Sequence, residues 1–155
     1  MSFTIKLAQA ARDYEQARQL FIEYQQWLGF DLCFQNFDEE LNELQTMYCL
    51  PEGGILLLVT DTGIAGCIAL RKLSDGPGEI KRLFVRQEYR SSGYGRLLTE
   101  QIIELARKLG YRTLRLDTLD SMETAIKLYK DLGFKEIPQY RENPLDGARF
   151  FELVL

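Results

Sequence analysis

Apolar residues alternate with polar ones, or form short continuous runs, in several parts of the chain. Such patterns are typical of β-strands when turn residues bound them. They predict strands over Phe3–Leu7, Ile55–Thr60, Ile64–Leu70, Glu79–Val85, Arg112–Leu119, Phe134–Ile137 and Arg149–Leu155. The turn Asp61-Thr62-Gly63 joins the second and third of these and favours a β-hairpin.

Other segments repeat their apolar residues at the spacing of one helix face. Glycine follows three of these segments, at positions 29, 110 and 133, where it can end a helix in the left-handed conformation. Helices are predicted over Asp13–Leu28, from a cap at Asn36 or Asp38 to Tyr48, over Gly95–Leu109, and from a cap at Asp120 or Ser121 to Leu132. Strands mixed with helices, with no linker or repeat, predict one α/β domain over residues 1–155.

Composition narrows the possible chemistry. A chain of 155 residues with 46% hydrophobic residues can bury a core without disulfides or metal. It has no histidine, which excludes Ser-His-Asp and Cys-His catalytic sites and any His-ligated metal. Its cysteines, Cys33, Cys49 and Cys67, form no CxxC pair, so three buried, reduced thiols and no metal are expected. No signal pattern or membrane-spanning run is visible, so a soluble cytoplasmic protein is expected.

Charge is unevenly distributed along the chain. The net charge is −4 and the pI is about 5.0, which argues against a broad nucleic-acid-binding face. From Gln19 to Leu70 there are eight acidic and no basic residues, whereas Glu79 to Arg96 holds five basic and two acidic residues. Two interpretations stay open: faces that attract ligands of opposite sign, or ordinary solvated surfaces.

A glycine-rich turn, Arg90-Ser91-Ser92-Gly93-Tyr94-Gly95, lies between a predicted strand and a predicted helix. Free N–H groups at a helix start bind phosphate, glycine lets the backbone approach it, and Arg90 and Arg96 flank the turn. Position 98 is Leu98, so the dinucleotide-binding glycine pattern is incomplete, and no Gly-Lys-Ser/Thr is present. The turn alone leaves a structural turn or another nucleotide-binding protein as alternatives.

The run VRQEYRSSGYGRLL resembles motif A of the GNAT superfamily of N-acetyltransferases, and AIKLYKDLGF resembles its motif B. The strand EIKRLFV before motif A also matches in type and spacing, so the resemblance covers Glu79 to Phe134. It implies a GNAT-like α/β (α+β mixed) fold, with a central mixed sheet of about six to seven strands and about four flanking helices. It also implies acetyl-CoA as cofactor and an amine as acetyl acceptor.

The resemblance further implies where the cofactor lies. Main-chain amides of Ser91, Ser92, Gly93, Tyr94, Gly95 and Arg96 would hold the pyrophosphate, with Arg90 beginning the motif. The pantetheine arm would pair with Leu83, Phe84 and Val85, in a gap between the strands Glu79–Val85 and Arg112–Leu119. Many relatives have Asn where this chain has Met122, so that contact must be absent, be replaced by Ser121, or become apolar packing.

Acetyl transfer to an amine needs a proton acceptor, a donor to the departing thiolate and a partner for the carbonyl oxygen. The motif B tyrosine falls at Tyr129, a candidate proton donor, although a helical tyrosine can equally be a core residue. Glu79 and Asp117 are candidate bases, acting directly or through water. The alternatives are a surface carboxylate for Glu79 and a strand-end polar contact for Asp117. A main-chain N–H near Val85 would contact the carbonyl oxygen.

The segment WLGFDLCFQNFDEE is both aromatic and acidic, and in this superfamily that region commonly shapes the acceptor site. Its aromatic residues are Trp27, Phe30, Phe34 and Phe37, and its acidic residues are Asp31, Asp38, Glu39 and Glu40. They favour a cationic small-molecule or peptide amine; the alternative is a helical hairpin with a solvated acidic face. A CoA-binding module without turnover is the alternative function. No nucleic-acid or membrane partner is expected, and the protein is expected to be a monomer or homodimer.

Overall fold

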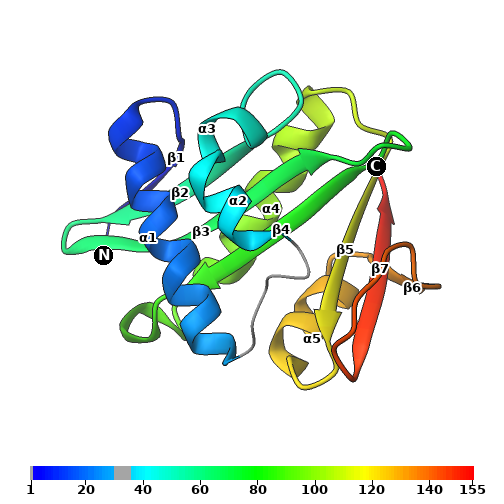
Figure 1. Ribbon diagram of the computed structural model, residues 1–155. Helices are drawn as coiled ribbons and strands as arrows, with labels where there is room; N and C mark the ends of the chain where they lie inside the picture. Colours follow the sequence, from blue (N-terminus) through cyan, green and yellow to red (C-terminus); the bar gives the residue numbers. More distant parts are fainter. Residues whose placement is uncertain (1, 30–35) are drawn as a thin grey trace.

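The computed structural model describes residues 2–29 and 36–155, and its strands form one sheet. The strands are β1 (Phe3–Leu7), β2 (Gly54–Thr60), β3 (Gly63–Lys72), β4 (Gly78–Val85), β5 (Thr113–Leu119), β6 (Lys135–Ile137) and β7 (Ala148–Val154). The seven strands are arranged in the order β1-β2-β3-β4-β5-β7-β6 (Figure 1). Only β4 and β5 run parallel; the other neighbours are antiparallel.

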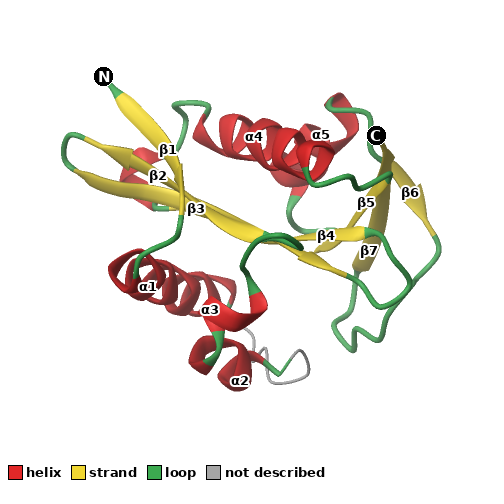
Figure 2. Ribbon diagram, turned by 90° about the horizontal axis from the view of Figure 1, so that it is seen from above, coloured by secondary structure: helices red, strands yellow, loops and turns green. Residues whose placement is uncertain are grey.

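Helices cover both faces of this sheet. They are α1 (Ala11–Leu28), α2 (Phe37–Asn42), α3 (Leu44–Met47), α4 (Tyr94–Lys108) and α5 (Glu123–Asp131), with a short 3-10 turn, η2, at Gln87–Tyr89. Figure 2 shows α1, α2 and α3 on one face and α4 and α5 on the other. The predicted α/β fold with a mixed sheet is confirmed.

The continuous apolar run of β2 is explained by burial on both faces. Leu56 and Leu58 contact the cluster under α4, whereas Ile55 and Leu57 contact the cluster under α1. Alternate side chains of a strand point to opposite faces, so a central strand covered on both sides is apolar throughout.

The predicted helix from Asn36 or Asp38 to Tyr48 is wrong in one respect. It is divided into α2 and α3 at Glu43, whose φ of −127° lies outside the helical region. Asn42, just before the break, is a weak helix former. Similarly, neither Asp120 nor Ser121 caps α5: the cap position is Met122, and no side chain bonds there.

The parallel pair β4–β5 is joined over a short stretch only. The paired residues are Gly78 with Leu114 and Glu79 with Arg115, after which the two strands diverge (Figure 1). On its other side β4 is irregular: its register with β3 shifts, and Arg82 has a φ of 60°. This divergence opens the cleft described next.

Candidate active site

A cleft of about 900 Å³ lies where β4 and β5 diverge. Strand β4 lines one wall from Ile80 to Val85, and the other wall contains Asp117 of β5 and Tyr129 of α5. The turn that leads from β4 into α4 lines one end, and Trp27 of α1 also borders the space. A single cavity therefore joins the glycine-rich turn to the candidate catalytic residues.

The glycine-rich turn has the geometry of an anion site. Gly93, at the N-cap of α4, has a φ of 80°, which favours glycine. A Cβ atom built on Gly93 or on Gly95 would meet no atom within 4 Å, so open space lies against the first turn of the helix. Of the residues predicted to hold the pyrophosphate, Ser91, Gly93, Tyr94, Gly95 and Arg96 line the cleft. Ser92 is not among the lining residues. The N–H groups at this helix start suit a phosphate.

The main chain of β4 faces the gap at the predicted pantetheine residues. The Arg86 amide donates to the Ala65 carbonyl of β3 at 2.8 Å. Main-chain groups of successive strand residues point to opposite sides, so those of Val85 and Leu83 point toward the cleft. All three predicted residues, Leu83, Phe84 and Val85, line it. The open strand edge therefore fits the amide groups of a pantetheine arm.

Arg90 covers part of that edge. Its Nε donates to the Val85 carbonyl at 2.9 Å, and its guanidinium lies 4.7 Å from the centre of the Trp27 ring. A second aromatic ring, Phe84, lies 5.8 Å away. Arg90 thus lines the cleft as predicted but faces the strand edge.

Tyr129 is buried on α5 and lines the cleft. Its ring packs edge-on against Phe134, with centroids 5.6 Å apart. Burial raises the pKa of the Tyr129 phenol, and the nearby Tyr24 and Asp117 raise it further. The hydroxyl is therefore protonated at neutral pH, as a proton donor must be.

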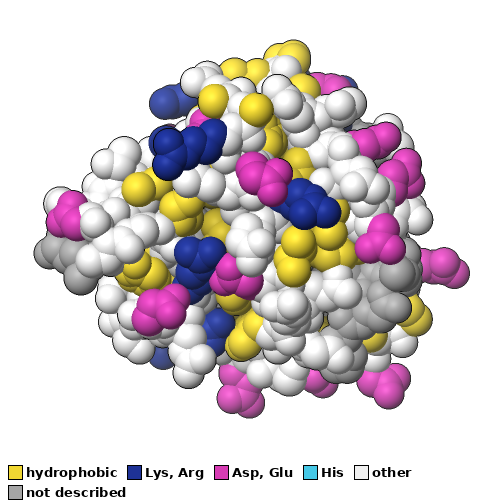
Figure 3. Space-filling view, turned by 60° about the vertical axis from the view of Figure 1, so that its left-hand side comes forward, with side chains coloured by type: hydrophobic (Ala, Val, Ile, Leu, Met, Phe, Trp, Pro, Cys, Tyr) yellow, Lys and Arg dark blue, Asp and Glu magenta, His cyan; other side chains and the backbone are white. Residues whose placement is uncertain are grey.

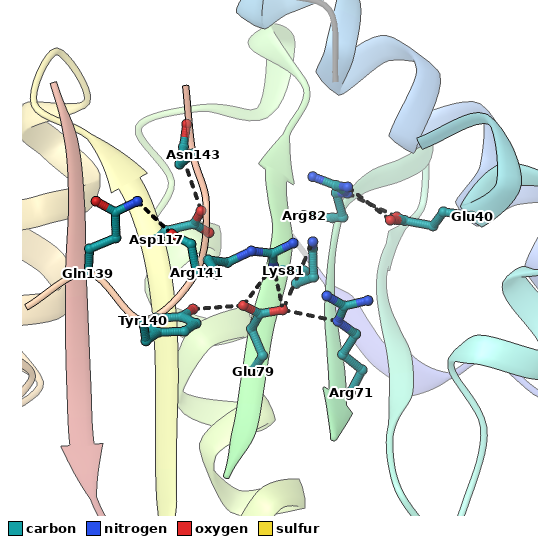
Figure 4. A network of polar contacts seen from close by, with 10 residues as sticks. All are labelled: Glu40, Arg71, Glu79, Lys81, Arg82, Asp117, Gln139, Tyr140, Arg141 and Asn143. Atoms are coloured by element: carbon teal, nitrogen blue, oxygen red, sulfur yellow. Dashed lines mark hydrogen bonds and ion pairs between the residues drawn. The ribbon is translucent and has the colours of Figure 1, made fainter. Parts of the chain in front are cut away.

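The two candidate carboxylates occupy different environments (Figure 4). Asp117 lines the cleft and accepts a hydrogen bond of 3.1 Å from the Asn143 side-chain amide. Glu79 is fully buried, is not among the residues that line the cleft, and accepts a 2.7 Å bond from the Tyr140 hydroxyl. Arg71 and Arg141 also bond to it, at 3.0 to 3.1 Å.

The charges around Glu79 determine its pKa. Burial alone would raise the pKa of the Glu79 carboxyl, but the cations Lys81, Arg141 and Arg71 outweigh burial and hold it below its ordinary value. A carboxylate stabilised in this way binds protons weakly. Its position and its charge partners therefore disfavour Glu79 as the base, whereas the position of Asp117 favours it.

A model of the acetyltransferase (GNAT) family matches residues 14–134. The chain belongs to the GNAT family. An uncharacterised N-acetyltransferase of Schizosaccharomyces pombe is 39% identical over 157 residues, covering 99% of this chain and 96% of that protein. One of Dictyostelium discoideum is 29% identical over 213 residues, covering 97% and 99%.

Solved structures agree on the GNAT fold. An acetyltransferase of Streptococcus agalactiae superposes with a TM-score of 0.80 at 21% identity, covering 99% of this chain and 98% of that chain. A Bacillus subtilis acetyltransferase in complex with CoA gives 0.70 at 21% identity, covering 99% of both chains. This GNAT protein is an acetyl-CoA-dependent N-acetyltransferase.

Met122 departs from the GNAT pattern, and Cys49 departs from the expected burial of the cysteines. Met122, in place of the usual Asn, lines the cleft, and its sulfur lies 3.3 Å from the Thr118 hydroxyl. Ser121 lines the cleft as well, so replacement of the contact by Ser121 and packing by Met122 are both compatible with this geometry. Of the cysteines expected to be buried, Cys67 is buried and Cys49 is exposed, while Cys33 lies outside the described residues. Neither Cys49 nor Cys67 lines the cleft.

Lys81 was missed by sequence reasoning. It lines the cleft from β4, and its side chain is only 2% exposed. Burial, followed by the neighbouring charge of Arg82, lowers the pKa of Lys81 to about 7. A lysine within an alternating strand ordinarily indicates a solvated position, so the sequence carried no signal for this burial.

The acidic and basic segments of the sequence meet in the structure. Arg82 donates from its Nε and from one terminal guanidinium nitrogen to the two carboxylate oxygens of Glu40, each at 2.9 Å, and this pair is buried. Glu23 of α1 similarly accepts bonds of 2.9 and 2.8 Å from Arg86. On the face drawn in Figure 3, acidic and basic side chains of the described residues are intermingled. Part of the acidic segment therefore neutralises Arg82 of β4 and Arg86, which directly follows that strand.

The predicted acidic and aromatic acceptor surface is only partly described. Phe30, Asp31 and Phe34 lie outside the described residues. Phe37 and Glu40 are buried, Asp38 and Glu39 are exposed, and none of these four lines the cleft. Trp27 does line it, beside Tyr24 and Leu28. The described acidic residues of this predicted surface therefore give no support to a cationic acceptor. Tyr24 and Trp27 still form an aromatic wall of the cleft.

Proposed function

We propose that this GNAT enzyme transfers the acetyl group directly to a primary amine of a small molecule or peptide that shares the cleft with acetyl-CoA. The observation that carries the proposal is the continuous cavity from the first turn of α4 to Asp117 and Tyr129. A cofactor held at Gly93 and Gly95 and along Val85 would point its reactive end toward those two side chains. Both reactants then meet in one ternary complex.

Acetyl-CoA supplies the acetyl group as a thioester, whose carbon–sulfur bond breaks as the carbon–nitrogen bond to the amine forms. Tyr129 donates its phenolic proton to the departing sulfur. Asp117 accepts the proton that the amine nitrogen loses, directly or through a water molecule. A main-chain N–H of β4 near Val85 hydrogen-bonds to the carbonyl oxygen as negative charge develops on it. Phenol and carboxylate then exchange the proton back through solvent.

The replacement Tyr129→Phe tests the proton donor. Removing the hydroxyl should lower kcat by about 100-fold, the order expected of general acid catalysis, and leave the Kd for CoA nearly unchanged. Release of free thiol from acetyl-CoA measures kcat, and calorimetric titration with CoA measures the Kd. Tyr111→Phe is the matched control, because Tyr111 lies outside the cleft. Equal activity of Tyr129→Phe and wild type would remove Tyr129 from the mechanism.

Asp117→Asn tests the proposed base. Its kcat should fall strongly near pH 7 and recover as the pH rises, because the free amine then loses its proton to solvent. Asp131→Asn, on the exposed side of α5, is the control. If Asp117→Asn shows the same pH profile as wild type, water alone accepts the proton.

The acceptor is proposed as a class only. Among the relatives, N-acetylaspartate synthetase of Danio rerio is 26% identical over 110 residues, covering 70% of this chain and 39% of that protein. Its name describes the acetyl amide of an amino acid, which supports an amine of small size. A reducing compartment such as the cytoplasm fits the free thiols of Cys49 and Cys67. Within the described residues, no helix is long and apolar enough to span a bilayer.

A further inference from the structure

The deep end of the cleft has walls of opposite charge. Glu79 of β4 pairs with Arg115 of β5, so the residues two positions further, Lys81 and Asp117, are level with each other on the same face of the sheet. Both line the cleft, at the point where the strands begin to diverge. A ligand in this position meets an amino group on the β4 wall and a carboxylate on the β5 wall.

Three cations lie around Glu79, next to the deep end of the cleft. The carboxylate of Glu79 is shared by Arg71 at 3.0 Å, Arg141 at 3.0 Å and Lys81 at 4.0 Å. Figure 4 shows these side chains gathered around Glu79, with Arg82 directed away toward Glu40. Of the three cations, Lys81 also lines the cleft, so its amino group is the one that a ligand carboxylate would meet.

We propose that the acceptor is an amino acid or a closely related zwitterion, whose carboxylate binds at Lys81 while its amine faces Asp117. This inference rests on the proposed transfer to an amine in the same cleft. Asp117 and Tyr129 line the same cleft, so an amine at Asp117 shares the cavity with the proposed proton donor. The carboxylate, on the opposite wall, meets the positive field of Lys81, Arg71 and Arg141.

The cleft also suits an apolar side chain on such an amino acid. Tyr24, Trp27 and Leu28 of α1 line the same cavity, and Trp27 is 52% exposed. Aromatic faces of this kind stabilise apolar groups removed from water. Aromatic and aliphatic amino acids are therefore the members of the class that the walls fit.

Protonation of Lys81 links acceptor binding to pH. Burial lowers the pKa of Lys81 to about 7, and a bound carboxylate would raise it again. The titratable and charged groups around Lys81 are Glu40, Arg71, Glu79, Arg82, Asp117, Tyr140 and Arg141. Carboxylate binding should therefore take up protons above pH 7, and the acceptor KM should rise with pH.

The test compares matched acceptors: phenylalanine, its carboxamide and phenethylamine, and likewise leucine, leucinamide and isoamylamine. Thiol release from acetyl-CoA gives kcat/KM for each compound. We expect the acids to exceed the analogues that lack the carboxylate by at least about tenfold, in line with a charge-assisted contact. In Lys81→Met that ratio should fall toward one, chiefly through KM. Lys72→Met, at a half-exposed lysine of β3, should keep the wild-type ratio.

The wild-type comparison stands even if Lys81→Met does not fold, and Lys81→Gln provides a second variant. Turnover of the amines that lack a carboxylate at rates equal to the acids would overturn the zwitterion while leaving acetyl transfer intact. An equal fall of kcat for all acceptors in Lys81→Met would make Lys81 a proton-transfer residue and overturn the carboxylate contact. If no acceptor releases thiol although CoA binds, the proposed function fails and this inference fails with it.

Discussion

Replacing Glu40 by glutamine should destabilise the protein strongly, because it leaves a buried arginine charge without its counterion. Two hydrogen bonds of 2.9 Å join Arg82 to the Glu40 oxygens, and the side chains are 3% and 1% exposed. Glutamine offers one oxygen and no charge. Breaking a buried ion pair from one side costs about 3–5 kcal/mol. We expect a loss of this size in the free energy of unfolding.

The same change should reach the cofactor strand. Arg82 has a φ of 60°, a conformation that costs a non-glycine residue about 1–2 kcal/mol. Arg82 stands immediately before Leu83, at the start of the open strand edge, and we expect its ion pair with Glu40 to help hold this conformation. Without Glu40 the strand can relax, so the Kd for CoA should rise as well.

Urea unfolding followed by circular dichroism measures the loss, and a thermal scan should show Tm lower by roughly 10 °C. Glu39→Gln, at the exposed neighbouring position, should change stability by no more than about 0.5 kcal/mol. The double variant Glu40→Leu/Arg82→Met should recover most of the loss, because paired apolar residues replace a buried ion pair well. A loss below about 1 kcal/mol in Glu40→Gln, or a double variant less stable than the single one, would refute this reasoning.

Three further outcomes follow from named contacts. The unfolded-state pKa of lysine is 10.5 and that of buried Lys81 is about 7, so the unfolded chain binds more protons between these values. Wild type should therefore be less stable than Lys81→Met by the largest amount below pH 7, and this difference in unfolding free energy should shrink as the pH rises toward 10.5. Urea titrations showing the opposite trend would contradict this expectation. In Gly66→Ala the new Cβ would lie 2.4 Å from the Phe84 carbonyl, so unfolding should become easier by about 1–3 kcal/mol and CoA affinity should fall in calorimetry. In Gly95→Ala the Cβ enters open space, so stability should rise by up to about 1 kcal/mol while CoA binds more weakly; unchanged affinity would exclude the close approach of phosphate.

Local periodicity was sufficient to predict most of the fold. The apolar run of β2 and the helical repeat of α4 predict these elements correctly, because the apolar residues that form each pattern are the residues buried in the core. The division of the predicted helix at Glu43 was not visible, since its residues continue an amphipathic pattern across the break.

The geometry of the glycine-rich turn at one end of the cleft could be predicted, whereas the buried polar cluster around Glu79 could not. Gly93 and Gly95 lie in a local motif whose geometry depends on adjacent residues. Glu79, Lys81 and Arg82, by contrast, are polar residues in a strand, and their burial depends on partners far along the chain. Glu40 is 42 residues from Arg82, and Arg141 is 62 residues from Glu79. No local pattern specifies such pairs.

The separation of β4 from β5 has a consequence for how the sheet responds to its cofactor. Among the residues that the structure describes, strand pairing between β4 and β5 is limited to Gly78 with Leu114 and Glu79 with Arg115. An arm that hydrogen-bonds to Leu83 and Val85 would act as an added strand and bridge the two halves of the sheet. The amide hydrogens of these two residues would then exchange slowly with deuterium in the complex and quickly in the free protein. In such a complex, acetyl-CoA would join β4 to β5 where the two strands themselves are not paired.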